Sequence, residues 1–213
     1  MAGKDKVSEA VVRRLPTYHR YLERLAQEGT TRISSQELGQ RMGLTASQIR
    51  QDINCFGTLG QQGYGYNVEE LRGRIAEILG LGRAYHVIVV GAGNIGRAVT
   101  NYVGFTRLDF AVEALFDVDS TRVGERVGDA EIFSTHTLPA YLTTHRVDIS
   151  IIATPAEAAQ GIADELMEGG VRALWNFAPV DIVAKPGCVV QNVQLTDNLL
   201  VLTYHMLNDP AEQ

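Results

Sequence analysis

The spacing of apolar and polar residues along the chain changes near residues 80–85. Before this point, apolar residues recur every three or four positions, which is typical of amphipathic helices. After it, runs of β-branched residues alternate with helical patterns, which predicts a β-α-β order and a parallel sheet. We therefore expect a helical domain over residues 1–82, a sheet domain over 83–194 and a terminal helix over 195–213.

The helical domain begins with a helix in which Pro16 is expected to occupy the first turn. Gly43 separates two further short helices, and this arrangement is typical of a helix-turn-helix. A capping box is expected at the start of each of them: Ser34 with Glu37, and Thr45 with Gln48. The apolar stripes of the three helices are Tyr18, Leu22 and Leu25; Leu38 and Met42; and Ile49, Ile53 and Phe56.

The polar face of the third helix matches the chemistry of DNA. Arginine pairs with guanine, glutamine and asparagine pair with adenine, and serine accepts or donates to either. Asp52 is the exception on this helix, and we expect it to hold an arginine because it would repel phosphate. The alternative is an ordinary solvated face. The residues of this face are Ser47, Gln48, Arg50, Gln51 and Asn54.

The stretch 57–66 follows directly and combines repeated glycines with two tyrosines, which predicts a β-hairpin. A hairpin after a recognition helix would be the wing of a winged helix, with Gln61 and Gln62 at its tip. The alternative is a flexible loop. With the wing and the neighbouring helices, the full predicted DNA-binding set is Arg14, Ser34, Ser35, Thr45, Ser47, Gln48, Arg50, Gln51, Asn54, Gln61, Gln62 and Tyr64.

Charge is distributed unevenly between the two domains. The whole chain of 213 residues carries −6, but residues 1–85 carry +3 and residues 86–213 carry −9. The first domain can therefore attract nucleic acid while the second repels it. No apolar run approaches 18 residues, the first residues lack a signal core, and the two cysteines, Cys55 and Cys188, form no C-x-x-C pair. We expect a cytoplasmic protein with no membrane partner.

The sheet domain opens with a strand, three glycines and a helix, in the order of a dinucleotide-binding turn. The run 87–90 is β-branched, and Gly91, Gly93 and Gly96 follow in the spacing G-x-G-x-x-G. In such a turn the first glycine permits the bend, the second lets the backbone approach a pyrophosphate, and the third allows the helix to pack on the strand. We predict that residues Gly91, Ala92, Gly93, Asn94, Ile95 and Gly96 hold the pyrophosphate.

Asp117 ends the second strand about 20 residues after the last glycine, where a carboxylate can accept from ribose hydroxyls. No arginine follows at once, so NAD(H) is favoured over NADP(H). The alternative is a solvated acid in a turn. Later strands end at Thr154-Pro155 and at Asn176-Phe177, which could border the nicotinamide; capping and core packing are the alternatives. The remaining predicted cofactor residues are Val118 and Tyr102.

The terminal helix is apolar over nearly its whole circumference, and Thr196 is its expected N-cap. One domain face rarely covers such a helix, so we expect a two-fold homodimer in which this helix is exchanged. Docking onto the chain's own sheet is the alternative.

A dehydrogenase needs an acid or base beside the hydride acceptor. Lysine occurs only at Lys4, Lys6 and Lys185, and no histidine has an obvious acidic partner at a strand end. No metal motif is present. The residues therefore favour a module that reads a nucleotide and reports it to DNA. An NAD-dependent oxidoreductase with an accessory helical domain is the alternative, and binding of CoA or another nucleotide is a third possibility.

Five motifs together resemble the bacterial redox-sensing repressor family Rex, and the resemblance covers nearly the whole chain. They are residues 48–52, 56–68, 91–96, 116–119 and 176–180. The resemblance implies an α/β protein: a winged helix-turn-helix domain, then a Rossmann-type doubly wound parallel sheet that binds NAD(H), and a homodimer with exchanged C-terminal helices. It also implies a repressor, not an enzyme, that leaves double-stranded operator DNA when NADH replaces NAD+.

The chain departs from that pattern at a few positions. Gln51 stands where many members carry lysine, and Gln61 and Gln62 stand where many carry basic residues. Fewer cations predict a shallower dependence of DNA affinity on salt. Gln194 replaces an aspartate that some members pair with residues matching Arg20 and Tyr102, so the resemblance does not supply that contact here.

Overall fold

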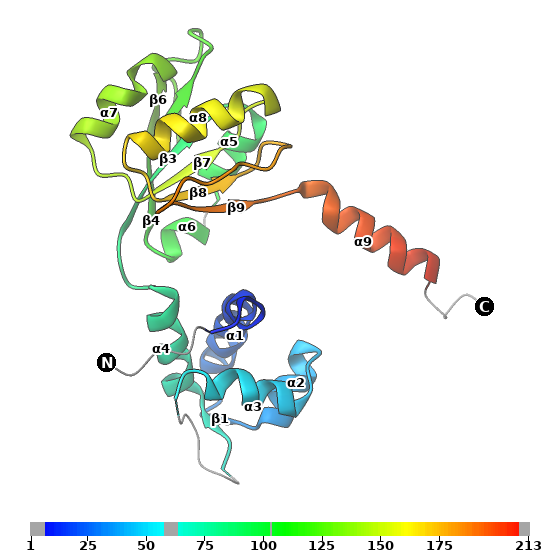
Figure 1. Ribbon diagram of the computed structural model, residues 1–213. Helices are drawn as coiled ribbons and strands as arrows, with labels where there is room; N and C mark the ends of the chain where they lie inside the picture. The colour runs from blue at the N-terminus through cyan, green and yellow to red at the C-terminus, as the bar shows by residue number, and fades with distance from the viewer. Residues whose placement is uncertain (1–6, 58–63, 103, 209–213) are drawn as a thin grey trace. The chain divides into compact units, whose positions relative to one another are not determined.

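The computed structural model describes residues 7–57, 64–102 and 104–208. The chain divides into two compact units, Met1–Arg83 and Ala84–Gln213 (Figure 1). The expected boundary after residue 82 lies one residue from this division. The division falls where the spacing of apolar residues changes from helical to alternating.

The first unit is a small helical domain with a two-stranded sheet. Its apolar core gathers residues from every helix, and α1 packs along α4. The hydrophobic stripes predicted from the sequence are buried at Tyr18, Leu22, Leu25, Leu38, Ile49 and Ile53. The elements are α1 (Glu9–Gln27), β1 (Arg32–Ile33), α2 (Ser35–Met42), α3 (Ala46–Asn54), β2 (Tyr66–Asn67) and α4 (Val68–Leu79).

Helix α1 begins earlier than the sequence predicts, so the placement of Pro16 in its first turn is wrong. Ser8 caps the helix by accepting from the backbone N–H of Val11, and Pro16 lies in the interior. The apolar stripe extends backwards through Val11 and Leu15, both buried. Burying these two side chains outweighs the cost of one missing helical hydrogen bond at Pro16.

The turn between α2 and α3 follows the predicted pattern more closely. Gly43 ends α2 in the left-handed region with φ 68°. Thr45 and Gln48 form a complete capping box at α3. The box predicted at α2 is only half formed, because Ser34 accepts from the N–H of Glu37 while the Glu37 carboxylate pairs with Arg41 at 3.2 Å.

The described end of the predicted wing pairs with a strand that the sequence analysis did not predict. Strand β2 runs antiparallel to β1, with Ile33 opposite Tyr66. Residues 58–63 lie outside the described residues, and so do the predicted tip residues Gln61 and Gln62. The stretch therefore joins α3 to a short sheet formed with β1, which lies in the segment between α1 and α2.

The second unit contains a seven-stranded sheet in the order β5-β6-β4-β3-β7-β8-β9, with only β5 antiparallel. From β3 the chain builds outward through β4 and β6, and then returns to the other side of β3 for β7, β8 and β9. This reversal creates a crevice beyond the carboxyl ends of β3 and β7, where such sheets bind ligands. The strands are β3 (Tyr85–Val90), β4 (Phe110–Asp117), β5 (Arg126–Val127), β6 (Ala130–Ser134), β7 (Ile149–Ile152), β8 (Ala173–Asn176) and β9 (Val189–Asn192).

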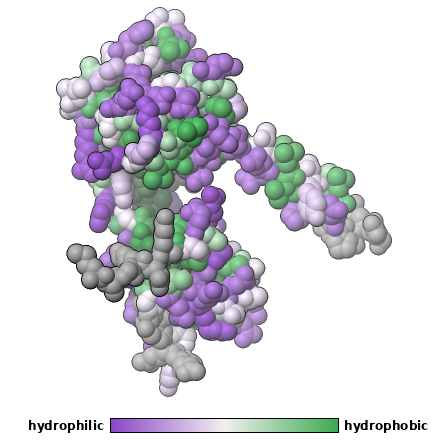
Figure 2. Space-filling view, viewed as in Figure 1, coloured by the Kyte–Doolittle hydropathy of each residue, from purple (hydrophilic) through white to green (hydrophobic). Residues whose placement is uncertain are grey.

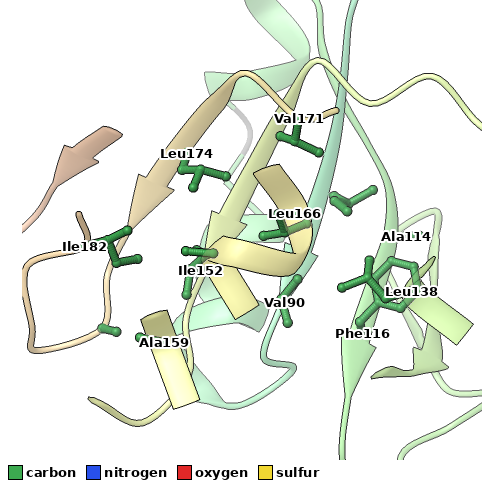
Figure 3. Close-up of a cluster of buried hydrophobic side chains, with 13 residues drawn as sticks. Val90, Ala114, Phe116, Leu138, Ile152, Ala159, Leu166, Val171, Leu174 and Ile182 are labelled. Carbon is green, nitrogen blue, oxygen red and sulfur yellow. The ribbon is translucent and has the colours of Figure 1, made fainter. Parts of the chain in front are cut away.

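Helices cover both faces of this sheet, as the predicted doubly wound fold requires. Figure 3 shows one core, in which Val90, Phe116 and Ile152 of the strands meet Ala159 and Leu166 of a helix. Alternate strand residues form the second core on the opposite face. The helical elements are α5 (Asn94–Thr100), α6 (Gly104–Arg107), η1 (Thr135–Thr137), α7 (Leu138–Thr144), α8 (Ala156–Glu168) and α9 (Leu195–Asn208).

The final helix α9 has no buried residue, although its surface is rich in apolar side chains (Figure 2). The docking of this helix onto the chain's own sheet, the alternative drawn from the sequence, is therefore wrong. The helix begins at Leu195, so Thr196 lies in its first turn and is not its N-cap. No helix among the described residues is long and apolar enough to cross a membrane. The exposed apolar residues of α9 are Leu195, Leu199, Leu200, Val201, Leu202, Tyr204, Met206 and Leu207.

Candidate nucleotide-binding and DNA-binding sites

In the glycine turn after β3, two of the glycines are required by close contacts within the chain itself. A Cβ on Gly91 would collide with the carbonyl oxygen of Ala153, and a Cβ on Gly96 would collide with the carbonyl oxygen of Gly91. Gly91 also has φ 104°, which disfavours any other residue. These two positions explain how β3 can turn sharply into α5 while β7 lies alongside.

Gly93 is different, because nothing in the chain requires a glycine there. Its φ is −76°, which any residue adopts, and a Cβ built on it meets no atom within 4 Å. The residue precedes α5 directly and lines a cavity of about 470 Å³. The backbone at Gly93 is thus open to a ligand from the side on which a side chain would stand.

Asp117 lies at the end of β4, and its carboxylate already accepts three hydrogen bonds. Oδ2 accepts from the backbone N–H of Ala92 at 2.7 Å and from Nη1 of Arg122 at 3.1 Å. Oδ1 accepts from the backbone N–H of Asp119 at 2.9 Å. The side chain is nearly buried yet borders the cavity, so the glycine turn and the carboxylate form one connected structure.

Six of the predicted cofactor residues line this cavity, and they lie at or just after the carboxyl ends of β3, β4 and β7. One further feature points to a ligand: the hydroxyl of Thr154 is buried and has no hydrogen-bond partner within the part of the chain that the structure describes. A buried hydroxyl without a partner is unfavourable, and a ligand that bonds to it would relieve that cost. The predicted residues that line the cavity are Gly91, Gly93, Asp117, Val118, Thr154 and Pro155.

The other seven predicted cofactor residues do not line this cavity: Ala92, Asn94, Ile95 and Gly96 of the glycine turn, and Tyr102, Asn176 and Phe177. Asn176 is fully buried at the end of β8, and its side-chain amide bonds to Ala178 and Val180 in the loop that follows and to Asn192 at the end of β9. Tyr102 and Phe177 lie at the two ends of a chain of aromatic rings that runs through Phe105 and Trp175. Their contact with a nicotinamide stays a prediction.

The predicted recognition helix α3 exposes the polar side chains expected to face DNA. Arg50 donates from Nη1 to Oγ of Ser35 at 3.1 Å, which links α3 to the start of α2. Ser34 and Thr45 serve as the caps of these helices, and Tyr64 is 70% exposed beside the short sheet. The exposed side chains on α3 are Ser47, Gln48, Arg50, Gln51 and Asn54.

Asp52 lies at the edge of the exposed polar face of α3, with its side chain buried, and it holds an arginine as the sequence predicts. Two nitrogens of Arg14 donate to its two carboxylate oxygens, each at 2.7 Å, and the hydroxyl of Tyr18 donates at 2.9 Å. Burial and the bond to Asp52 raise the pKa of Tyr18, so it remains a donor at neutral pH. Arg14 therefore positions α3, and its predicted DNA contact stays a prediction.

Two candidate residues were missed by the sequence analysis. Arg122 reaches back across a turn to Asp117, whereas an arginine was expected only directly after that carboxylate. Arg32 in β1 donates to the carbonyl of Tyr64 at 3.1 Å and lies 5.9 Å from the centre of its ring. Arg122 follows Asp117 by five residues across a turn that also contains Asp119, and this short separation could have indicated the contact. No pattern in the sequence indicated the contact of Arg32 with Tyr64.

Comparison with known proteins identifies the family. One family model, described as the N-terminus of putative DNA-binding proteins, matches residues 6–54, and another, described as a CoA binding domain, matches residues 82–180. The redox-sensing transcriptional repressor Rex of Clostridium beijerinckii is 53% identical over 209 residues, which cover 98% of this chain and 99% of that protein. The chain belongs to the Rex family. The Rex repressor of Clostridium tetani is 49% identical over 212 residues and 100% of both chains.

Solved structures of RSP, a Rex-family repressor, share the fold. RSP is 43% identical, with a TM-score of 0.89 over 94% of each chain. Its complex with beta-NAD+ and operator DNA gives a TM-score of 0.90 at 45% identity, over 94% of this chain and 93% of that one. Its complex with beta-NADH gives 0.87 at 42% identity, over 94% of each chain. The fold class and the Rex resemblance are confirmed, and these relatives are named as repressors, not as enzymes.

Proposed function

We propose that the chain is an NADH/NAD+-responsive transcriptional repressor that acts in the cytoplasm as a homodimer and leaves operator DNA when NADH binds. The observation that carries this proposal is the open backbone at Gly93, which faces a cavity lined by Asp117 and the unpartnered hydroxyl of Thr154. The same chain carries an exposed recognition helix. The Rex-family structures with NAD+, NADH and operator DNA support joining the two.

The residues present fit a dinucleotide. The pyrophosphate would lie on the backbone of the glycine turn, and a ribose hydroxyl would donate to Oδ1 of Asp117, which accepts only one hydrogen bond from the described residues. The hydroxyl of Thr154 would bond to a polar group of the ligand. When bound, the nicotinamide supplies a redox-dependent charge and ring shape.

The response to redox state then follows from differential affinity. NADH and NAD+ share their adenosine half, so the contacts at Asp117 cannot distinguish them. Only groups near the nicotinamide can, and a ligand shifts a conformational equilibrium only by its difference in affinity for the two states. If NADH favours a dimer in which two α3 helices no longer match successive major grooves, operator affinity falls.

The apolar surface of α9 supports the homodimer. We expect the chain to sediment as a dimer at micromolar concentration, and Leu202→Glu to shift it towards monomer because a charge would enter the apolar contact. Asn208→Glu, at an exposed polar position of the same helix, is the control for the added charge itself. A wild-type chain that sediments as a monomer would contradict the homodimer.

Operator binding titrated with both cofactors tests the repressor proposal. A duplex selected from a random-sequence pool by the protein itself supplies the probe, and fluorescence anisotropy measures binding at fixed salt. We expect NADH to weaken binding and NAD+ to weaken it far less. Equal responses to both would rule out the redox sensor.

Two further measurements separate the other candidates. Calorimetry with CoA tests the ligand named by the matching family description, and heat from CoA but none from NADH would favour that ligand. Turnover of NADH with an added acceptor would favour the oxidoreductase instead.

A further inference from the structure

Arg122 lies beside Asp117, the carboxylate that would accept from the adenosine ribose of the proposed dinucleotide. Its Nη1 lies 3.1 Å from Oδ2 of Asp117, and its Nε lies 3.3 Å from Oδ2 of Asp119. All three residues line the cavity that also holds Gly93. The Arg122 side chain is 38% exposed, so a ligand can reach its guanidinium.

The two kinds of charge have opposite effects on a 2′-phosphate. A carboxylate at this position accepts from the ribose 2′-hydroxyl and repels a phosphate there, whereas a nearby arginine accommodates the phosphate. Asp117, Asp119 and Arg122 together carry a net charge of −1, which disfavours a phosphate less than the two carboxylates alone would. Arg122 presents a planar array of N–H donors that suits phosphate oxygens.

We propose that Arg122 is a specificity-determining residue that limits the discrimination of this site against 2′-phosphorylated dinucleotides. The site therefore binds NADPH more weakly than NADH but measurably, with Arg122 donating to the 2′-phosphate. This inference rests on the proposed dinucleotide site. It concerns the relative affinity of two ligands that differ only at the ribose 2′ position, so the nicotinamide and pyrophosphate contacts cancel in the comparison.

The test is calorimetric titration of the full-length protein with NADH and with NADPH. In Arg122→Gln we expect NADPH affinity to fall about tenfold while NADH affinity changes less than about threefold, since only NADPH places a phosphate beside the lost cation. In Arg122→Lys the ratio of NADPH affinity to NADH affinity is expected to stay near the wild-type value, because the positive charge is kept. In Asp119→Asn, NADPH affinity is expected to rise severalfold. Arg126→Gln, on β5 outside the cavity, is the matched control.

If Arg122→Gln lowered the affinities for NADPH and NADH equally, Arg122 would contact the adenosine that both ligands share. If it changed neither affinity, Arg122 would contact neither the phosphate nor the adenosine. Either result overturns the proposal. Undetectable NADPH binding in the wild type and in Asp119→Asn also overturns it. Should Arg122→Gln fail to fold, Arg122→Lys and Asp119→Asn still decide. Failure of the wild type to bind NADH would instead contradict the proposed function.

Discussion

Replacing Gly93 with alanine is expected to remove the response to NADH while leaving the fold intact. The added methyl group would stand where the structure leaves open space beside the backbone, and would hold a pyrophosphate away from the N–H groups of the turn. Loss of one hydrogen bond to a charged group costs about 1.5–3 kcal/mol, which corresponds to roughly a 10- to 150-fold loss of NADH affinity. Calorimetry measures that loss, and operator binding becomes insensitive to NADH over the wild-type range.

Gly161→Ala provides the matched control, because Gly161 is an exposed glycine in α8 and a Cβ added to it would meet no atom within 4 Å. This change is expected to leave NADH affinity unaltered and to stabilise the helix by about 0.5–1 kcal/mol. Thermal unfolding of both variants separates binding from folding. If Gly93→Ala bound NADH as tightly as the wild type, the ligand would not pass over this turn.

Removing Arg14 is expected to destabilise the first unit strongly. In Arg14→Ala the carboxylate of Asp52, with its side chain only 4% exposed, would keep a single donor in Tyr18 and lose its counter-charge. Breaking a buried ion pair costs about 3–5 kcal/mol, and the partial exposure of Arg14 places the expected cost near 3 kcal/mol. Thermal unfolding followed by circular dichroism should show a melting temperature lower by about 10–20 °C for a unit of this size.

The adjacent arginine on the same helix is the control. Arg13 pairs with Glu9 on the surface, where both side chains are mostly exposed, so Arg13→Ala should cost at most about 0.5 kcal/mol. The triple variant Arg14→Met, Tyr18→Phe and Asp52→Leu should recover most of the lost stability, because an apolar cluster needs no counter-charge and leaves no buried hydroxyl without an acceptor. Equal losses in Arg13→Ala and Arg14→Ala would contradict the structural role of the buried pair.

Features that depend on neighbouring residues were predictable from the sequence. The G-x-G-x-x-G turn, the alternation of strands and helices and the Thr45-Gln48 box each arise within a few residues, so their patterns stand in the chain directly. Pro16 was misplaced for the opposite reason. Its local preference for a first turn is weaker than the burial of Val11 and Leu15, which only the packed domain reveals.

For the cofactor residues, too, the sequence did not show the packing: it did not tell on which face of the sheet each residue lies. Phe177 and Thr154 both follow strand ends, but Phe177 packs with the core on one face, whereas the cavity is lined by Phe116 and Ile162 of the opposite face. Side chains alternate across a sheet, so a strand end alone does not tell which face a residue serves. Arg122 was missed because a turn, not adjacency in the chain, brings it to Asp117.

The chain of aromatic rings that runs from Tyr102 to Phe177 has a consequence for the fluorescence of the protein. Trp175, the only tryptophan of the chain, lies within it, 5.9 Å from Phe105 and 4.6 Å from Phe177. Reduced nicotinamide absorbs light where indole emits, and oxidised nicotinamide does not. A single emitter at the carboxyl end of the central sheet therefore gives the unlabelled protein an intrinsic fluorescent readout of which form of the cofactor it holds.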